Sequence, residues 1–214
     1  RSFTVDTTPP NTVIDGKPAN PTNLTSATFI FHSTDTGSTF QCQLDSGGFS
    51  ACTSGKNYTG LSQGNHTFDV KATDAAGNTD LTPDSYTWTV DTTPPTTTDN
   101  APAGWVAADR TVTLTPSDGS GSGVASTQYC TDSLNSCTPS TNGTSVLVSC
   151  SVGAVCQTNV RYRSTDNVGN VEAVKSALVR IDKAPPAAVT NLHASSVTQT
   201  SAAISWNNPA DSGS

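Results

Sequence analysis

Short segments in which large apolar residues alternate with small polar ones recur along the whole chain. This alternation has a period of two residues, which is typical of β-strands with one buried face. Gly, Asn, Asp and Pro separate the segments, and no segment has the i, i+3, i+4, i+7 spacing of an amphipathic helix. The pattern therefore predicts an all-β chain of short strands. The clearest segments are Ala27–His32, His66–Ala72, Ser85–Val90 and Thr111–Thr115.

One piece of this pattern is repeated. Ser2–Pro10 (SFTVDTTPP) is matched by Thr87–Pro95 (TWTVDTTPP), and a divergent copy occurs at Val179–Pro186. A period of roughly 90 residues is the signature of a tandem array, and it is about the length of one small β-sandwich. Each copy joins the end of a strand to a Pro-Pro linker. We therefore predict tandem β-sandwiches in an elongated array.

The repeats divide the chain into four segments. We expect residues 1–6 to be the final strand of a preceding repeat, 7–91 and 92–183 to be complete sandwiches, and 184–214 to hold the first strands of an incomplete module. About thirty residues are too few to bury a core unaided. The terminal pieces favour a window cut from a longer polymer. The alternative is donor-strand pairing, in which a terminal strand completes the sheet of a neighbouring subunit in a filament.

Two segments with turn residues occupy equivalent positions in the repeats. Lys71–Asp80 (KATDAAGNTD) aligns with Arg163–Glu172 (RSTDNVGNVE). Asp at the first turn position and Gly at the fourth suit a type I turn. We expect each segment to be the hairpin that joins the last two strands of its sandwich.

These motifs carry a resemblance to known families. Residues 7–91 resemble a bacterial immunoglobulin-like repeat of large surface and secreted proteins, through the Asp-Thr-Thr-Pro-Pro linker, the two cysteines and Ala72–Asn78. Residues 92–183 resemble a sister repeat, through Gly104-Trp105 and Tyr162–Glu172. From Pro186 onward the chain is similar to the start of a fibronectin type III module. The resemblance implies tandem immunoglobulin-like β-sandwiches, a fold that hosts many functions.

Composition and charge narrow the class of protein. The net charge is −7 and only 13% of residues are charged, so the chain lacks the basic stripe that nucleic acid requires. The chain has no run of 18 apolar residues, so we expect no membrane span in this segment. The sequence has no Met and no signal peptide, which indicates an internal or processed piece of a longer protein.

Cysteine spacing indicates disulfides and an extracellular location. An even number of cysteines in a small all-β chain is typical of a secreted disulfide framework. Zinc is the alternative, but no Cys-x2-Cys knuckle or His partner accompanies the cysteines. The sequence leaves the connectivity of the second sandwich open, and pairing of neighbours is favoured because Cys130 and Cys137 repeat the placement of Cys42 and Cys52. The close pairs are Cys42/Cys52, Cys130/Cys137 and Cys150/Cys156.

Catalytic patterns are missing from the sequence. The three histidines, His32, His66 and His193, lie far apart in the sequence, so they offer no histidine cluster for metal binding or acid–base chemistry. No Gly-x-Ser-x-Gly elbow or phosphate-binding loop is present. We therefore expect no enzyme activity, no catalytic residues and no bound organic cofactor.

Acidic residues at the hairpins raise the question of calcium. Asp74 and Asp80 flank one hairpin, and Asp166 and Glu172 flank the other at the same offset. Like charges facing across a hairpin are unfavourable without a cation, and Ca²⁺ prefers such oxygen ligands. The simpler interpretation is that Asp caps the turn while Lys71 or Arg163 supplies positive charge.

The tryptophans could be core residues or platforms that stack on sugars. Trp88 and Trp206 lie in segments of alternating pattern, so we expect both to pack in cores. Trp105 follows a Pro-Ala-Gly stretch and could lie at the surface.

The leading hypothesis is a non-catalytic structural segment of an extracellular protein of the bacterial cell surface, forming a stalk, fibre or filament. Its partners would be neighbouring copies or further repeats of the same polymer. Pro-Pro linkers fix φ and behave as semi-rigid spacers, although prolines also protect edge strands. The alternatives are an adhesin or carbohydrate-binding module, which would bind host or surface glycans, and an accessory array of a secreted hydrolase.

Overall fold

The computed structural model describes residues 5–207, and these residues form an all-β chain with no helix. The predicted strand segments are strands in the structure. In chain order the strands are β1 (Thr12–Gly16), β2 (Ser26–Ser33), β3 (Thr39–Leu44), β4 (Ser50–Cys52), β5 (Lys56–Thr59), β6 (Gly64–Thr73), β7 (Asp84–Val90), β8 (Thr96–Asp99), β9 (Trp105–Val106), β10 (Arg110–Ser117), β11 (Val124–Asp132), β12 (Thr141–Asn142), β13 (Ser145–Val148), β14 (Val155–Asp166), β15 (Lys175–Asp182), β16 (Thr190–Ser195) and β17 (Ala203–Asn207).

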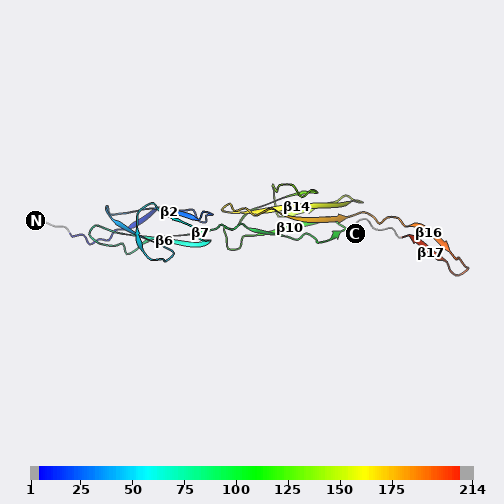
Figure 1. Cartoon of the computed structure of the whole chain (residues 1–214), viewed down its shortest axis with the longest axis horizontal. Helices are drawn as coiled ribbons and strands as arrows, with labels where there is room; N and C mark the ends of the chain where they lie inside the picture. The colour runs from blue at the N-terminus through cyan, green and yellow to red at the C-terminus, as the bar shows by residue number, and fades with distance from the viewer. Residues whose placement is uncertain (1–4, 208–214) are drawn as a thin grey trace. The chain divides into compact units, whose positions relative to one another are not determined.

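The first sandwich packs a three-stranded sheet, in the order β1-β2-β5, against a four-stranded sheet, in the order β4-β3-β6-β7 (Figure 1). The alternating pattern buries one face of each strand: Phe29 and Phe31 of β2 point inward, and the exposed Ile30 lies between them. The Phe29 ring stacks on Phe68 of β6 with centroids 4.0 Å apart. The buried core residues are Ala27, Phe29, Phe31, Cys42, Leu61, Phe68, Val70, Trp88 and Val90.

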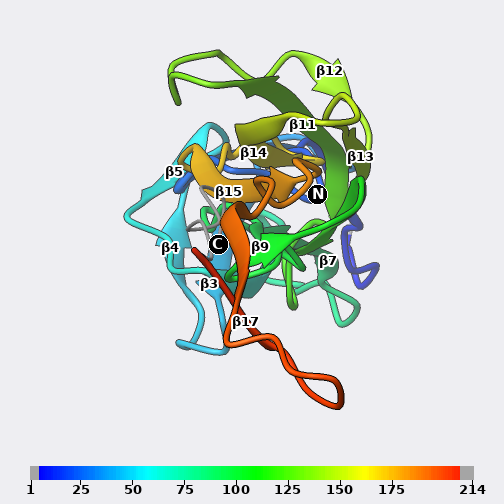
Figure 2. The ribbon, with the colours of Figure 1, turned by 90° about the vertical axis from the view of Figure 1, so that its right-hand side faces the viewer.

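The second sandwich repeats this arrangement with a larger second sheet. Its sheets have the orders β13-β10-β8 and β12-β11-β14-β15-β9. Figure 2 shows β11, β14 and β15 side by side in the larger sheet. β9 pairs in parallel with β15. A similar parallel bridge joins Thr22 to Val90 in the first sandwich. The buried core residues are Val112, Leu114, Val146, Val148, Cys150, Val160, Tyr162, Ala177, Val179 and Ile181.

The sheet orders make both sandwiches immunoglobulin-like, the fold class that the sequence predicts. The two predicted hairpins are confirmed, because they connect β6 to β7 and β14 to β15. The described part of the chain contains no helix long and apolar enough to span a membrane.

The chain separates into two compact units. The first comprises the chain up to Pro95 together with Asp118–Ala125 and Thr165–Val171, and the second comprises the rest. The terminal strand expected at residues 1–6 lies outside the described residues except for Val5 and Asp6, and so does the last part of the 184–214 segment, from residue 208.

The tryptophans differ in their environments. Trp88 is fully buried, as its alternating strand predicts. The prediction that Trp206 packs in a core is wrong, because its side chain is 54% exposed. Trp206 lies on β17, which pairs with β16 alone, and every residue of both strands is exposed. Trp105 is 37% exposed and lies at the edge of its sheet.

Each sandwich is cross-linked by disulfides between neighbouring cysteines. Cys42 bonds to Cys52 across β3 and β4 in the first sandwich. The second sandwich holds two bridges, Cys130–Cys137 and Cys150–Cys156, and no cysteine is free. All six residues that the sequence assigns to disulfides are therefore paired, and the zinc interpretation is excluded for them.

Candidate functional site

The hairpin between β6 and β7 is organised by Asp74. Its Oδ1 accepts hydrogen bonds from the backbone N–H groups of Ala76 (2.9 Å) and Asn78 (2.8 Å), and its Oδ2 accepts one from the Asn78 side-chain amide (2.8 Å). Gly77 has φ of 93°, a left-handed conformation that favours glycine. The hydrogen bond from the Asn78 side chain is the main cause that lowers the pKa of Asp74. The carboxylate is therefore the cap of the turn.

The hairpin between β14 and β15 repeats this geometry. Asp166 Oδ1 accepts from the N–H groups of Val168 (3.0 Å) and Asn170 (2.8 Å), and Oδ2 accepts from the Asn170 side chain (2.7 Å). Gly169 has φ of 94°. The two hairpins that align in the sequence therefore fold in the same way.

The asparagine of each hairpin also reaches the linker that precedes its repeat. Asn78 Nδ2 donates to the backbone oxygen of Asp6 (3.1 Å), and Asn170 Nδ2 donates to the backbone oxygen of Asp91 (2.8 Å). Asp6 and Asp91 are the same residue of the repeated Asp-Thr-Thr-Pro-Pro linker. We name this pair of hydrogen bonds the linker clamp. Sequence reasoning did not identify it, although the repeated Gly-Asn dipeptide was its signal.

Asp80 and Glu172, the second acids of the hairpins, hold the first strand of each sandwich. Asp80 Oδ2 accepts from the Thr12 N–H (3.0 Å) and hydroxyl (2.7 Å). Glu172 accepts from the Thr97 N–H (2.8 Å) and hydroxyl (2.7 Å) and pairs with Lys175 Nζ at 2.6 Å. Burial opposes ionisation of both carboxyls, but these hydrogen bonds outweigh it and lower both pKa values.

Two acids were considered for calcium at each hairpin, Asp74 with Asp80 and Asp166 with Glu172. Each carboxylate is occupied by protein donors. The positive charge expected from Lys71 or Arg163 lies elsewhere: Lys71 Nζ lies over the Phe49 ring at 4.4 Å, and Arg163 Nε is buried without a partner.

Among residues 5–207, one group of three acids is close enough to share a cation. Asp91, Asp118 and Asp166 place one carboxylate oxygen each within 4.8 Å of one another in the first unit. Hard oxygen ligands of this kind could hold Ca²⁺. Of the four residues proposed from the sequence, only Asp166 belongs to this group. Asp118 was missed because it precedes a Gly-Ser stretch, residues 119–123, that contains no other acidic residue.

Backbone and side-chain donors surround the acid group. Asp91 Oδ2 accepts from the Ser122 N–H (2.6 Å), Asp91 Oδ1 accepts from the Gln63 side chain (3.0 Å), and Asp118 Oδ2 accepts from the Gly123 N–H (2.7 Å). Burial disfavours the charge on Asp91, but the hydrogen bonds from Gln63 and Ser122 outweigh it and lower its pKa. A Cβ at Gly121 would meet the Asp118 carboxylate at 2.5 Å, so a side chain there would displace that carboxylate.

Removing one charge from the group should stabilise the cation-free protein. We expect Asp118→Asn to raise the free energy of unfolding by about 0.5 kcal/mol in EDTA, because like charges this close repel and Asn keeps an acceptor for the Gly123 N–H. Urea unfolding measures the difference, with Asp69→Asn as the matched control outside the group. A destabilised Asp118→Asn variant in EDTA would contradict this electrostatic account.

His66 is a buried histidine with an acceptor at each ring nitrogen. Nδ1 lies 2.6 Å from Asp45 Oδ2, and Nε2 lies 2.9 Å from the backbone oxygen of Ser62. Both nitrogens must donate to satisfy these acceptors, which requires the imidazolium form. Burial lowers the pKa of His66, but the hydrogen bonds to Ser62 and Asp45 outweigh it, and the net pKa is raised.

The stability of the first sandwich should therefore fall as the pH rises above the ordinary histidine pKa of 6.5. The folded pKa of His66 lies above the ordinary value of 6.5, so its contribution is complete below that pH and is lost as the pH rises through the folded pKa. Unfolding in urea at several pH values between about 6 and 9 measures this slope. His66→Gln should abolish the part of this slope that His66 contributes. An unchanged slope in His66→Gln would refute the assignment.

The histidines do not form a catalytic group in the described part of the chain. His32 pairs with Asp15, His66 with Asp45, and His193 with Ser205 on an exposed hairpin. These three places lie on different strand pairs, β1–β2, the start of β6, and β16–β17.

Comparisons with known proteins give structural similarity only. No protein family model matches the chain, and no curated protein matches it. A structure of Clostridium thermocellum CbhA fibronectin(III)-like modules is 16% identical over 80% of this chain and 93% of that chain, with a TM-score of 0.41. Chicken CNTN1 FN1-FN3 domains are 13% identical over 95% and 76% of the two chains, with a TM-score of 0.36. The central fibronectin-III array of RIM-binding protein is 12% identical over 90% and 78%, with a TM-score of 0.27.

Proposed function

We propose that the chain is a non-catalytic structural segment of an extracellular protein of the bacterial surface, and that it serves in a stalk, fibre or filament of immunoglobulin-like repeats. The observation that carries this proposal is the linker clamp. In each repeat, the asparagine of the hairpin donates a hydrogen bond to the equivalent aspartate of the linker. These bonds join Asn78 to Asp6 and Asn170 to Asp91. The clamp recurs at both Asp-Thr-Thr-Pro-Pro linkers, which is why we assign its role to the linker.

The physical chemistry of the linker supports a mechanical role. Pro-Pro fixes φ at two successive positions, and the residue before each proline is restricted to extended conformations. The clamp then removes freedom from Asp91, whose side chain also caps the linker by accepting the Thr93 N–H (3.2 Å). A linker restricted at these positions resists bending, which is the property that a spacer requires.

The disulfides support the extracellular location. Three bridges in a chain of 214 residues are typical of proteins that fold in oxidising compartments. Thin sandwiches with small cores depend on such cross-links, because their buried apolar area is limited. Neighbouring copies or further repeats of the same polymer are the partners that we propose.

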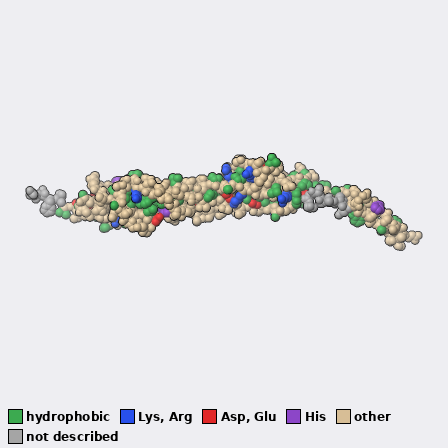
Figure 3. All heavy atoms as spheres, viewed as in Figure 1, with side chains coloured by type: hydrophobic (Ala, Val, Ile, Leu, Met, Phe, Trp, Pro, Cys, Tyr) green, Lys and Arg blue, Asp and Glu red, His purple; other side chains and the backbone are tan. Residues whose placement is uncertain are grey.

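Surface charge argues against nucleic acid as a partner. On the face shown in Figure 3, the Lys and Arg side chains gather mainly over the second sandwich, with acidic side chains among them. The chain as a whole carries 10 Lys and Arg against 17 Asp and Glu. Binding to phosphates requires an excess of positive charge on one face.

The proposal is tested by measuring how far the linker bends. Spin labels attached through non-natural amino acids at the exposed Thr28 and Thr113 report the distance between the two sandwiches by pulsed electron resonance. We expect a narrow distance distribution in the wild type and a broad one in Asn170→Ala, which removes the clamp. Asn159→Ala, on β14, is the matched control and should stay narrow. A wild-type distribution as broad as that of Asn170→Ala would overturn the mechanical role.

A glycan array with the same chain separates this role from that of an adhesin. We expect no saturable binding to any glycan, because the proposed role needs only protein partners. Saturable binding to one class of glycan would instead favour the carbohydrate-binding alternative.

A further inference from the structure

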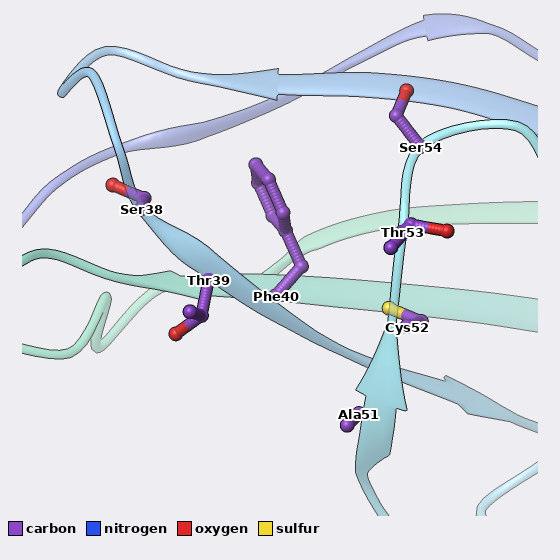
Figure 4. Close-up of a pocket in the computed structure, with 7 residues that line it drawn as sticks. All are labelled: Ser38, Thr39, Phe40, Ala51, Cys52, Thr53 and Ser54. Atoms are coloured by element: carbon purple, nitrogen blue, oxygen red, sulfur yellow. The ribbon is translucent and has the colours of Figure 1, made fainter.

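The first sandwich contains a pocket that none of the structural roles above uses. Its volume is about 360 Å³, and it opens between β3 and the segment that follows β4 (Figure 4). This volume lies at the lower end of the range for pockets that bind small molecules. The lining residues are Ser38, Thr39, Phe40, Ala51, Cys52, Thr53 and Ser54.

Both walls of the pocket are fixed before any ligand arrives. The Cys42–Cys52 disulfide ties β4 to β3. Across the pocket, the Phe31 N–H donates to Ser54 Oγ (2.9 Å), and the Gly55 N–H donates to the backbone oxygen of Phe29 (3.0 Å). The segment after β4 is therefore fastened to β2 and cannot collapse onto Phe40 without breaking these bonds.

The interior of the pocket is apolar. The Phe40 ring points into it, and its orientation is held by an edge-on contact with Phe31, with centroids 5.1 Å apart and planes at 65°. In Figure 4 the hydroxyls of Ser38 and Thr53 point away from the Phe40 ring. The Ser38 hydroxyl donates to the backbone oxygen of Asp35 (2.8 Å), so it is already occupied.

We propose that this pocket binds a small, neutral aromatic compound of one or two fused rings. A flat ring can stack on Phe40 and contact the polarizable sulfur of Cys52, because both residues line the pocket. No charged side chain lines the pocket, so it offers a charged group no partner. A sugar ring fits less well, because its hydroxyls would find few free donors and acceptors inside.

The test is a titration of the whole chain with indole, followed by amide chemical shifts in two-dimensional NMR. We expect saturable shifts at Phe40, Cys52 and Thr53, with a dissociation constant on the order of 1 mM, as suits a ligand of few atoms. Phe40→Leu keeps an apolar side chain but removes the stacking face, and it should weaken indole binding by about tenfold or more.

The matched control is Tyr58→Leu, because Tyr58 is also a partly buried aromatic residue at the margin of the same core. The affinity of the Tyr58→Leu variant for indole should equal that of the wild type. The amide spectrum of each variant shows whether the sandwich remains folded. Absence of saturation at an indole concentration 10-fold above the expected dissociation constant would overturn the proposal. Equal weakening of indole binding in the two variants would also overturn it, and so would tighter binding of glucose than of indole.

Discussion

Removing both disulfides of the second sandwich is expected to lower its free energy of unfolding by about 5 kcal/mol. Cys130–Cys137 and Cys150–Cys156 span sequence separations of 7 and 6 residues. In the chain-entropy model each loop of this size contributes about 2.4 kcal/mol by restricting the unfolded chain. The total stability of a domain is about 5 to 15 kcal/mol. We therefore expect the second sandwich without its bridges to lose about a third or more of its stability.

The measurement compares urea unfolding of the second sandwich in the wild type and in a variant with all four cysteines changed to alanine. Methyl signals of the core residues Val179 and Ile181 report this sandwich alone. A matched variant, Cys42→Ala with Cys52→Ala, should destabilise only the first sandwich. A loss below about 1 kcal/mol in the four-alanine variant would show that the bridges do not stabilise the fold as proposed.

Glu172→Ala is expected to cost the second sandwich about 3 kcal/mol. Glu172 is buried, and its removal leaves the N–H groups of Thr97 and Ser164 without their acceptor. The Lys175 ammonium also loses its carboxylate partner at 2.6 Å, although this group is partly exposed and can turn to water. Buried donors without acceptors cost about 1 to 3 kcal/mol each.

Glu172→Gln separates the hydrogen bonds from the charge. Its side-chain oxygen can still accept from the Thr97 N–H, so we expect a smaller loss, of about 1 to 2 kcal/mol. Urea unfolding measures both variants. Equal stability of Glu172→Ala and the wild type would contradict the role of Glu172 as the anchor of β8.

Local patterns account for what the sequence predicts well. The alternation in Ala27–His32 places Phe29 and Phe31 inside, because successive side chains of a strand point to opposite faces. The hairpin Asp74–Asn78 is predictable because Asp and Gly restrict a turn through contacts within five residues. Close cysteine spacing similarly favours pairing of neighbours in all three bridges.

Features that depend on residues far apart in the sequence are harder to predict. Asp91 and Asp166 are separated by most of a repeat, and nothing in their local sequence shows that Asp118 joins them. The linker clamp likewise joins Asn170 to a residue 79 positions earlier. The alternating pattern around Trp206 predicted burial, but alternation shows only which face a residue occupies, and neither face of the β16–β17 hairpin is covered.

The most direct test of the account is the motion of the linker on the picosecond-to-nanosecond timescale, measured by ¹⁵N relaxation at the amides of Asp91, Thr92 and Thr93. We predict order parameters near 0.85 in the wild type, as in the flanking strand β7, and lower values in Asn170→Ala. Order parameters below about 0.6 in the wild type would show that the linker is a flexible tether, contrary to the mechanical role proposed for the chain.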